Sequence, residues 1–116
     1  MSVALALRLE GLAVGSAAAV LYFDQGYSWI VFVVLLLAPD LGMLGYLAGP
    51  RVGAATYDLL HFEAFPVVLG LIGLLADADV LVQLALIWLT HIGVDRALGY
   101  GLKYPTAFRD THLQRV

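Results

Sequence analysis

The sequence contains no cysteine and very few charged residues. Without cysteine, the chain has no disulfide, no thiolate metal ligand and no cysteine nucleophile. Charged residues fill 13% of the 116 positions and hydrophobic residues fill 62%, whereas an average soluble domain is about a quarter charged. So few charges cannot cover a water-soluble domain of this length, and the mean hydropathy of +0.92 agrees. The composition therefore predicts an integral membrane protein.

Positive charge is especially scarce. The chain has six Lys and Arg residues against nine Asp and Glu residues, and its formal net charge is -3. A protein that binds nucleic acid needs a basic stripe for the phosphates. The dispersed cations form no such stripe, so we expect membrane lipids and no nucleic acid among the partners.

Four long apolar stretches are present, with little chain left over. A bilayer core about 30 Å thick needs about 20 apolar residues in one helix. The sequence thus predicts a single all-α integral-membrane domain, residues 1–116, built as a four-transmembrane-helix bundle with a short polar C-terminal tail. Turn signals or helix-start signals separate the stretches. The expected spans are about 3–23, 27–47, 52–75 and 80–100, and the tail is 101–116.

The positions of the cations predict the orientation of the chain. Lys and Arg near the ends of spans are retained on the cytoplasmic side. All six cations lie near the N-terminus, in the second connection, or from the end of the fourth span onward; they are Arg8, Arg51, Arg96, Lys103, Arg109 and Arg115. The charged residues of the first and third connections are all acidic. We therefore expect a multi-pass protein of the cell inner membrane with both termini in the cytoplasm.

Ionisable residues inside the predicted spans gather at one depth. Each would cost several kcal/mol if it faced lipid. At 1.5 Å per residue they lie about 7–15 Å from the cytoplasmic ends of the spans, and every span supplies at least one. They are Glu10, Asp40, Asp58, His61, His91 and Asp95. The outer half of the spans carries none, so the pattern predicts one polar site near the cytoplasmic face.

The spacing of these residues favours a metal site. Asp58 and His61 are three residues apart, and His91 and Asp95 are four apart, so each pair shares a helix face. Short connections make consecutive helices antiparallel neighbours, and the two faces can then surround one cavity. Imidazole and carboxylate ligands suit Zn, Fe or Mn, although no compact H-E-x-x-H motif is present. The candidate ligands are His61, His91, Asp40, Asp58 and Asp95.

The fourth span and the tail combine acids, bases, phenols and cations. With a metal, the site would suit an intramembrane hydrolase, isomerase or oxidase that acts on a lipid-like or isoprenoid-like substrate. Without a metal, His91 and Asp95 would act as an acid–base pair. Lys103 and Arg109 are equally compatible with a role as interfacial anchors. The candidate catalytic residues are His91, Asp95, Glu10, Arg96, Tyr100, Lys103 and His112.

Three other functions remain open. One is a proton-coupled transporter, but the outer half of the spans offers no ionisable residue for a through-going path. Another is a haem or ligand-binding protein that uses His61 and His91; haem is the less favoured cofactor, because a carboxylate so near each histidine suits a metal or a proton relay better. The third is a non-catalytic scaffold. Glycine faces predict close helix contacts and are compatible with a homodimer or homotrimer.

Several segments resemble a known family. They are residues 37–40 (LAPD), residues 45–53 (GYLAGPRVG) and residues 91–104, followed by residues 110–113 (DTHL). They are similar to segments of the bacterial membrane family catalogued as domain of unknown function 4260, and the resemblance covers nearly the whole chain. It implies a small multi-span membrane protein and adds no activity, cofactor or functional residue.

Overall fold

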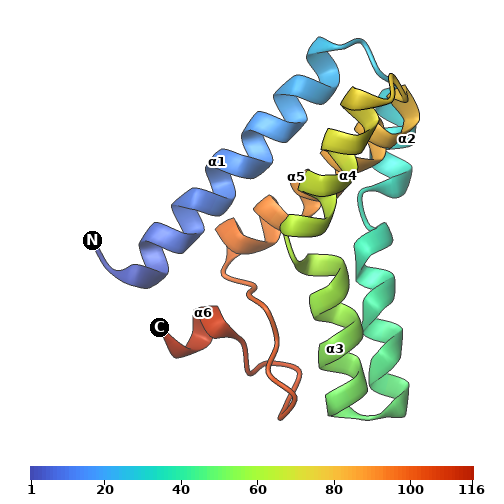
Figure 1. The fold of residues 1–116 in the computed structure, drawn as a ribbon. Helices are drawn as coiled ribbons and strands as arrows, with labels where there is room; N and C mark the ends of the chain where they lie inside the picture. Colours follow the sequence, from blue (N-terminus) through green and yellow to red (C-terminus); the bar gives the residue numbers. More distant parts are fainter.

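The computed structural model describes residues 1–116, and its regular elements are all helices (Figure 1). They are α1 (Val3–Asp24), α2 (Trp29–Leu35), the 3-10 helix η1 (Ala38–Ala48), α3 (Pro50–His61), α4 (Ala64–Leu75), α5 (Asp79–Leu98) and α6 (His112–Arg115). Four segments are long and apolar enough to cross a membrane: Val3–Asp24, Trp29–Ala48, Pro50–Leu75 and Asp79–Leu98. The predicted all-α architecture with four spans is confirmed, and the chain is a multi-pass membrane protein.

The helices form two groups that diverge. α1 and α4 both pack against α5, and η1 packs against α3 as an antiparallel hairpin. Figure 1 shows that α1 and the η1–α3 hairpin spread apart toward the end that holds both termini. Residues 99–116 run between them, and α6 contacts α1. The polar tail therefore returns onto the helices.

The second and third spans are each interrupted near the middle. After α2 the chain continues as η1, in which the Asp40 N–H donates to the carbonyl of Leu37 at 3.0 Å and leaves the carbonyl of Leu36 free. After α3, Phe62 is extended (φ -94, ψ 116), and Phe65 N–H donates to its carbonyl at 3.2 Å. Pro39 and Pro66 lack the N–H that a continuous helix needs at these points. Each predicted middle span is thus two helical segments.

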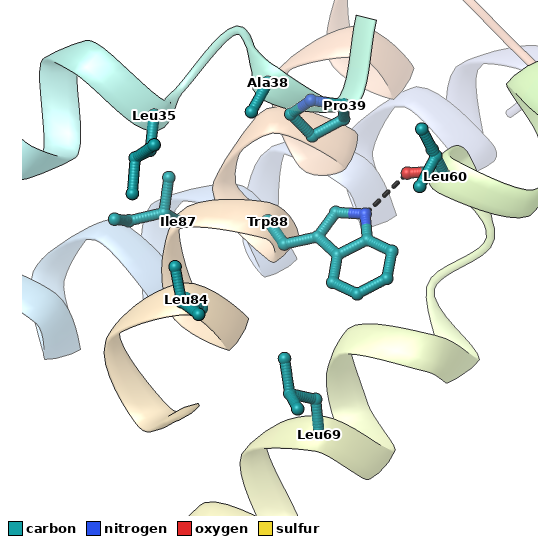
Figure 2. Close-up of a pocket in the computed structure, with 8 residues that line it drawn as sticks. All are labelled: Leu35, Ala38, Pro39, Leu60, Leu69, Leu84, Ile87 and Trp88. Atoms are coloured by element: carbon teal, nitrogen blue, oxygen red, sulfur yellow. Dashed lines mark hydrogen bonds between the residues drawn. The ribbon is translucent and has the colours of Figure 1, made fainter. Parts of the chain in front are cut away.

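Side chains of α5 bind the carbonyls that these interruptions leave free. The indole of Trp88 donates to Leu60 O at 2.5 Å (Figure 2), the imidazole of His91 donates to Leu36 O at 2.6 Å, and the guanidinium of Arg96 donates to His61 O at 2.9 Å. No water replaces such bonds in the hydrocarbon region, where an unsatisfied carbonyl costs several kcal/mol. Both interrupted spans are therefore attached to α5 through their own backbone.

Glycines allow the close helix contacts that hold this arrangement. Where α1 crosses α5, Gly15 and Gly93 face each other, and a Cβ atom added at Gly15 would lie 3.2 Å from the Cα of Gly93. On η1, Gly42 and Gly45 face Thr56 of α3, whose hydroxyl donates to Gly42 O at 2.6 Å. Small residues at such crossings are typical of membrane helices. These contacts lie within one chain.

We predict that Gly93→Val destabilises the fold, because the new side chain would overlap the backbone of α1 at Gly15. Overpacking of this kind costs about 1–3 kcal/mol. The loss is measured as a lower midpoint of thermal unfolding in detergent. Ala17→Leu adds the same number of carbon atoms to the exposed face of α1 and should change the midpoint little. Equal effects of the two variants would contradict the close crossing.

Candidate metal centre

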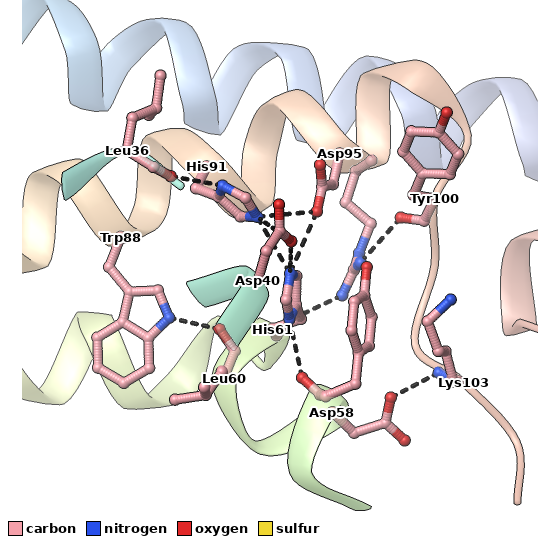
Figure 3. Close-up of polar contacts among 12 residues, drawn as sticks. Leu36, Asp40, Asp58, Leu60, His61, Trp88, His91, Asp95, Tyr100 and Lys103 are labelled. Atoms are coloured by element: carbon pink, nitrogen blue, oxygen red, sulfur yellow. Dashed lines mark hydrogen bonds and ion pairs between the residues drawn. The ribbon is translucent and has the colours of Figure 1, made fainter. Parts of the chain in front are cut away.

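Two imidazoles and two carboxylates converge where η1, the end of α3 and α5 meet (Figure 3). Asp40 lies in the first turn of η1, His61 is the last residue of α3, and His91 and Asp95 lie one turn apart on α5. Their four ligand atoms all lie within 4.8 Å of one another. The histidines are buried, whereas the side chain of Asp40 is 38% exposed. Three spans thus supply a site that is open beside Asp40.

The distances in this cluster are those of a tetrahedral metal site. The Nε2 atoms of His61 and His91 are 3.1 Å apart. His91 Nε2 lies 3.1 Å from Asp40 Oδ1 and from Asp95 Oδ2, and His61 Nε2 lies 3.3 Å from the same two oxygens. Metal–ligand bonds of about 2.0–2.1 Å in tetrahedral geometry separate the ligand atoms by about 3.3 Å. These five separations therefore match five of the six edges of such a tetrahedron, and the sixth, between the two carboxylate oxygens, is at most 4.8 Å.

Backbone carbonyls orient both histidines. His61 Nδ1 lies 2.8 Å from Tyr57 O, and His91 Nδ1 lies 2.6 Å from Leu36 O. A carbonyl oxygen only accepts, so each Nδ1 carries the hydrogen, and each neutral imidazole presents the lone pair of Nε2. The Tyr57 ring stacks on the His61 ring with centroids 3.7 Å apart. Outer contacts of this kind fix the tautomer and ring direction of metal-binding histidines.

With both imidazoles neutral, the cluster contains acceptors and no donor. Two Nε2 lone pairs and two carboxylate oxygens face one another at 3.1–3.3 Å. Neither carboxylate has a Lys or Arg partner within 4.0 Å. Four electron-rich atoms at such distances repel one another unless a cation lies between them. The arrangement can accordingly hold a metal ion or shared protons.

The same geometry does not fit a haem. Imidazoles on opposite faces of one iron would hold their Nε2 atoms about 4 Å apart, given metal–nitrogen bonds of about 2 Å. The Nε2 atoms of His61 and His91 are only 3.1 Å apart, and the two rings meet edge to face at 64°. Both carboxylates also touch this pair of nitrogens. A porphyrin cannot enter between the rings.

Asp58 lies outside the cluster, although its depth and spacing suggested a ligand. Its carboxylate accepts a hydrogen bond from the backbone N–H of Lys103 at 2.5 Å. Tyr100 and Lys103 line a cavity of about 300 Å³ together with Asp40 and Asp95. These two predicted residues therefore lie next to the cluster, and Asp58 holds the tail there.

The other predicted catalytic residues lie elsewhere. Glu10, Arg96 and His112 line a separate cavity of about 450 Å³ beside α1, and Glu63 lines it too. Sequence reasoning missed the carbonyls of Leu36 and Leu60 that α5 binds; the signal for them was the proline that follows each break. It also missed Phe108, a tail residue that lines the cavity beside the cluster and that no local pattern marks.

Hydrogen bonds fold the tail into a compact loop. Lys103 and Thr111 form an isolated antiparallel bridge, and Asp110 pairs with Arg115 at 2.6 Å. The Arg115 guanidinium and the Thr106 hydroxyl lower the pKa of Asp110 to about 2. His112 Nδ1 accepts the N–H of Leu102 at 2.8 Å. Burial, with the nearby Arg96 charge, lowers the pKa of His112.

The fold and the cluster define a small multi-pass helical membrane protein with a buried His/Asp site. The chain belongs to the family described as Domain of unknown function (DUF4260), whose sequence profile matches residues 4–116. The family resemblance of the sequence segments is thereby confirmed. No curated protein and no solved structure matches the chain.

We predict that the tail loosens in mild acid. Because the folded state lowers the pKa of His112 below 6.5, the folded tail favours neutral imidazole, and its stability is complete above pH 6.5 and falls as pH drops through the lowered pKa. Protonation would also break the bond from Leu102 N–H. Hydrogen exchange of residues 99–116, corrected for intrinsic rates, measures this loss between pH 8 and pH 5.

The matched control is His112→Asn. Its side-chain oxygen can accept from the same N–H but does not titrate. Exchange in this variant should change much less between pH 8 and pH 5. An identical pH dependence in both proteins would show that another group loosens the tail.

Proposed function

We propose that the protein is a membrane-embedded metalloenzyme that holds one divalent ion through Asp40, His61, His91 and Asp95. The convergence of four acceptor atoms without a donor carries this proposal. Two imidazoles and two carboxylates form a donor set that suits Zn, Fe or Mn. A divalent ion would also balance both carboxylate charges, and no Lys or Arg side chain lies within 4.0 Å of either carboxylate to do so. Zinc is the first candidate because five of the six ligand separations fit a tetrahedron.

Access to the cluster supports a catalytic role. Structural zinc sites are closed, whereas catalytic sites keep a position open for water or substrate. With four protein ligands, water or substrate would enter as a fifth ligand or in place of the carboxylate of Asp40, the most exposed of the four side chains. Asp40 is partly exposed, and Asp40 and Asp95 both line the cavity of about 300 Å³. A bound divalent ion would supply Lewis-acid polarisation of an ester oxygen and activation of water. Hydrolysis of an ester-type bond is therefore the reaction we propose.

An apolar groove beside the cluster supports a substrate with a hydrocarbon chain (Figure 2). Its volume is about 260 Å³. Its lining residues are Leu35, Ala38, Pro39, Leu60, Leu69, Leu84, Ile87 and Trp88. Pro39 and Leu60 directly precede the cluster residues Asp40 and His61 in the sequence. A chain lying in the groove would reach the cluster with its polar end, so we propose an amphiphile from the membrane as substrate.

Metal binding is the first test. Elemental analysis of the protein purified in detergent should find one metal ion per chain, and metal-free protein should bind one Co(II) with the visible spectrum of a tetrahedral site. Asp95→Asn should weaken Co(II) binding by more than the roughly 10–100-fold typical of outer-shell partners. Asp58→Asn is the matched control and should retain Co(II), because its carboxylate binds the tail. A wild-type chain that takes up no Zn, Fe, Mn or Co would leave protons as the cations of the cluster and overturn the proposal.

A second measurement separates an enzyme from a structural metal site. Azide added to the Co(II) protein should change the visible spectrum, because an accessible metal takes up a small anion at an open position. A closed site with four protein ligands would leave the spectrum unchanged. An unchanged spectrum would support metal binding and contradict the catalytic role.

We also propose that the protein lies in the cell inner membrane with both termini in the cytoplasm. The gathering of all six cations at the N-terminus, the second connection and the C-terminal region supports this orientation. Green fluorescent protein fused after Val116 should fluoresce in a bacterial host, because it folds in the cytoplasm. A dark GFP fusion together with an active alkaline phosphatase fusion at the same point would reverse the orientation.

A further inference from the structure

The tail carries a buried ammonium group without a contacting carboxylate. Lys103 is only 7% exposed. The side chains that lie within 4.0 Å of a carboxylate as ion-pair partners are His61, His91 and Arg115, so no acid touches the ammonium group of Lys103. Its Nζ donates to Phe108 O at 2.6 Å and lies 3.6 Å from the centre of the Phe108 ring. Buried charges are normally paired, and the protein supplies one acceptor, Phe108 O, for the three N–H donors of this group.

This ammonium group belongs to the wall of the cavity beside the cluster. Lys103 lines the cavity with Asp40 and Asp95, and the rest of the wall comes from Met43, Tyr57, Tyr100 and Phe108. Both lining carboxylates are directed at the two imidazoles, where a divalent ion would balance their charge. Lys103 is then the one charge in the wall without a counter-ion in contact.

Asp58 holds Lys103 in this position through the backbone. The carboxylate accepts from the Lys103 N–H, while the bridge to Thr111 ties the other side of the loop. The side chain of Lys103 also lies over the Tyr57 ring, with Nζ 4.4 Å from its centre. Two aromatic faces and two backbone contacts thus order the ammonium group before any ligand arrives, which lowers the entropic cost of binding.

We propose that this cavity binds the oxyanion of an amphiphile's head group, with the Lys103 ammonium as its counter-ion. The inference rests on the proposed function, since the same cavity borders the metal ligands, and it narrows the substrate to anionic amphiphiles. The head group would lie between Lys103 and the cluster, and the hydrocarbon chain would follow the apolar groove at Pro39 and Leu60. Asp58 is a positioning residue, because it acts through Lys103.

Dodecyl phosphate is the probe, titrated into the zinc-loaded protein in dodecyl maltoside, a neutral detergent with the same chain. Lys103→Met keeps the apolar stem and the backbone bond to Asp58, and it should weaken binding at least tenfold. Lys103→Arg should restore most of the affinity. Arg109→Gln removes an exposed cation of the same tail and should change affinity less than twofold. Equal losses in Lys103→Met and Arg109→Gln would indicate attraction to the surface charge and overturn the inference.

Inorganic phosphate in the same assay separates a head group from a free anion. It should bind far more weakly than dodecyl phosphate, because it lacks the chain. Equal affinities for dodecyl phosphate and inorganic phosphate would show that the site binds a free anion and not an amphiphile. Zinc content and circular dichroism of each variant keep this test distinct from the metal proposal. A Lys103→Met protein that is folded, holds zinc and binds dodecyl phosphate as the wild type does would refute the head-group site alone. If the chain takes up no metal, the proposed function fails, and the Lys103 dependence is still measured on the metal-free protein.

Discussion

Carbonyl groups released inside a membrane must find donors within the protein, and this requirement organises the whole structure. Two of the four spans are interrupted. At both interruptions, side chains of α5 donate hydrogen bonds to the released carbonyls; the donors are Trp88, His91 and Arg96. His91 donates through Nδ1, so its Nε2 keeps a lone pair that can bind a metal ion or a proton. The hydrogen bond that satisfies the Leu36 carbonyl therefore also orients the His91 imidazole toward the cluster.

The 3-10 winding of η1 serves the site as well. With three residues per turn, side chains three apart align in rows. One row holds Asp40, Met43 and Tyr46; the first two line the cavity, and Tyr46 packs against Phe108 of the tail. The neighbouring row holds Gly42 and Gly45, which face α3. In η1, Asp40 and Met43 thus face the cavity, while Gly42, Gly45 and the ring of Tyr46 pack against α3.

Hydropathy and length were enough to predict the four spans, because both are local properties of the chain. The depth of each residue also follows from its position in a span, which is why Asp40, His61, His91 and Asp95 could be assigned to one layer. The partner that a side chain meets cannot be predicted in the same way, since it depends on where the neighbouring helices and the tail lie. Asp58 shares the layer but is bound to the tail, and no local pattern shows that residues 99–116 fold back onto α3.

The need to satisfy the backbone explains only part of the buried polarity. The side chains of Trp88 and Arg96 and the Nδ1 atoms of the histidines all bind carbonyls, so a structural role accounts for them. The carboxylates of Asp40 and Asp95 bind no backbone group; their contacts are the two Nε2 atoms. Replacing buried charges by packed apolar residues is often neutral or stabilising, so packing alone gives no reason to keep these two acids. The proposed cation would give that reason, and both acids also line the cavity next to the cluster.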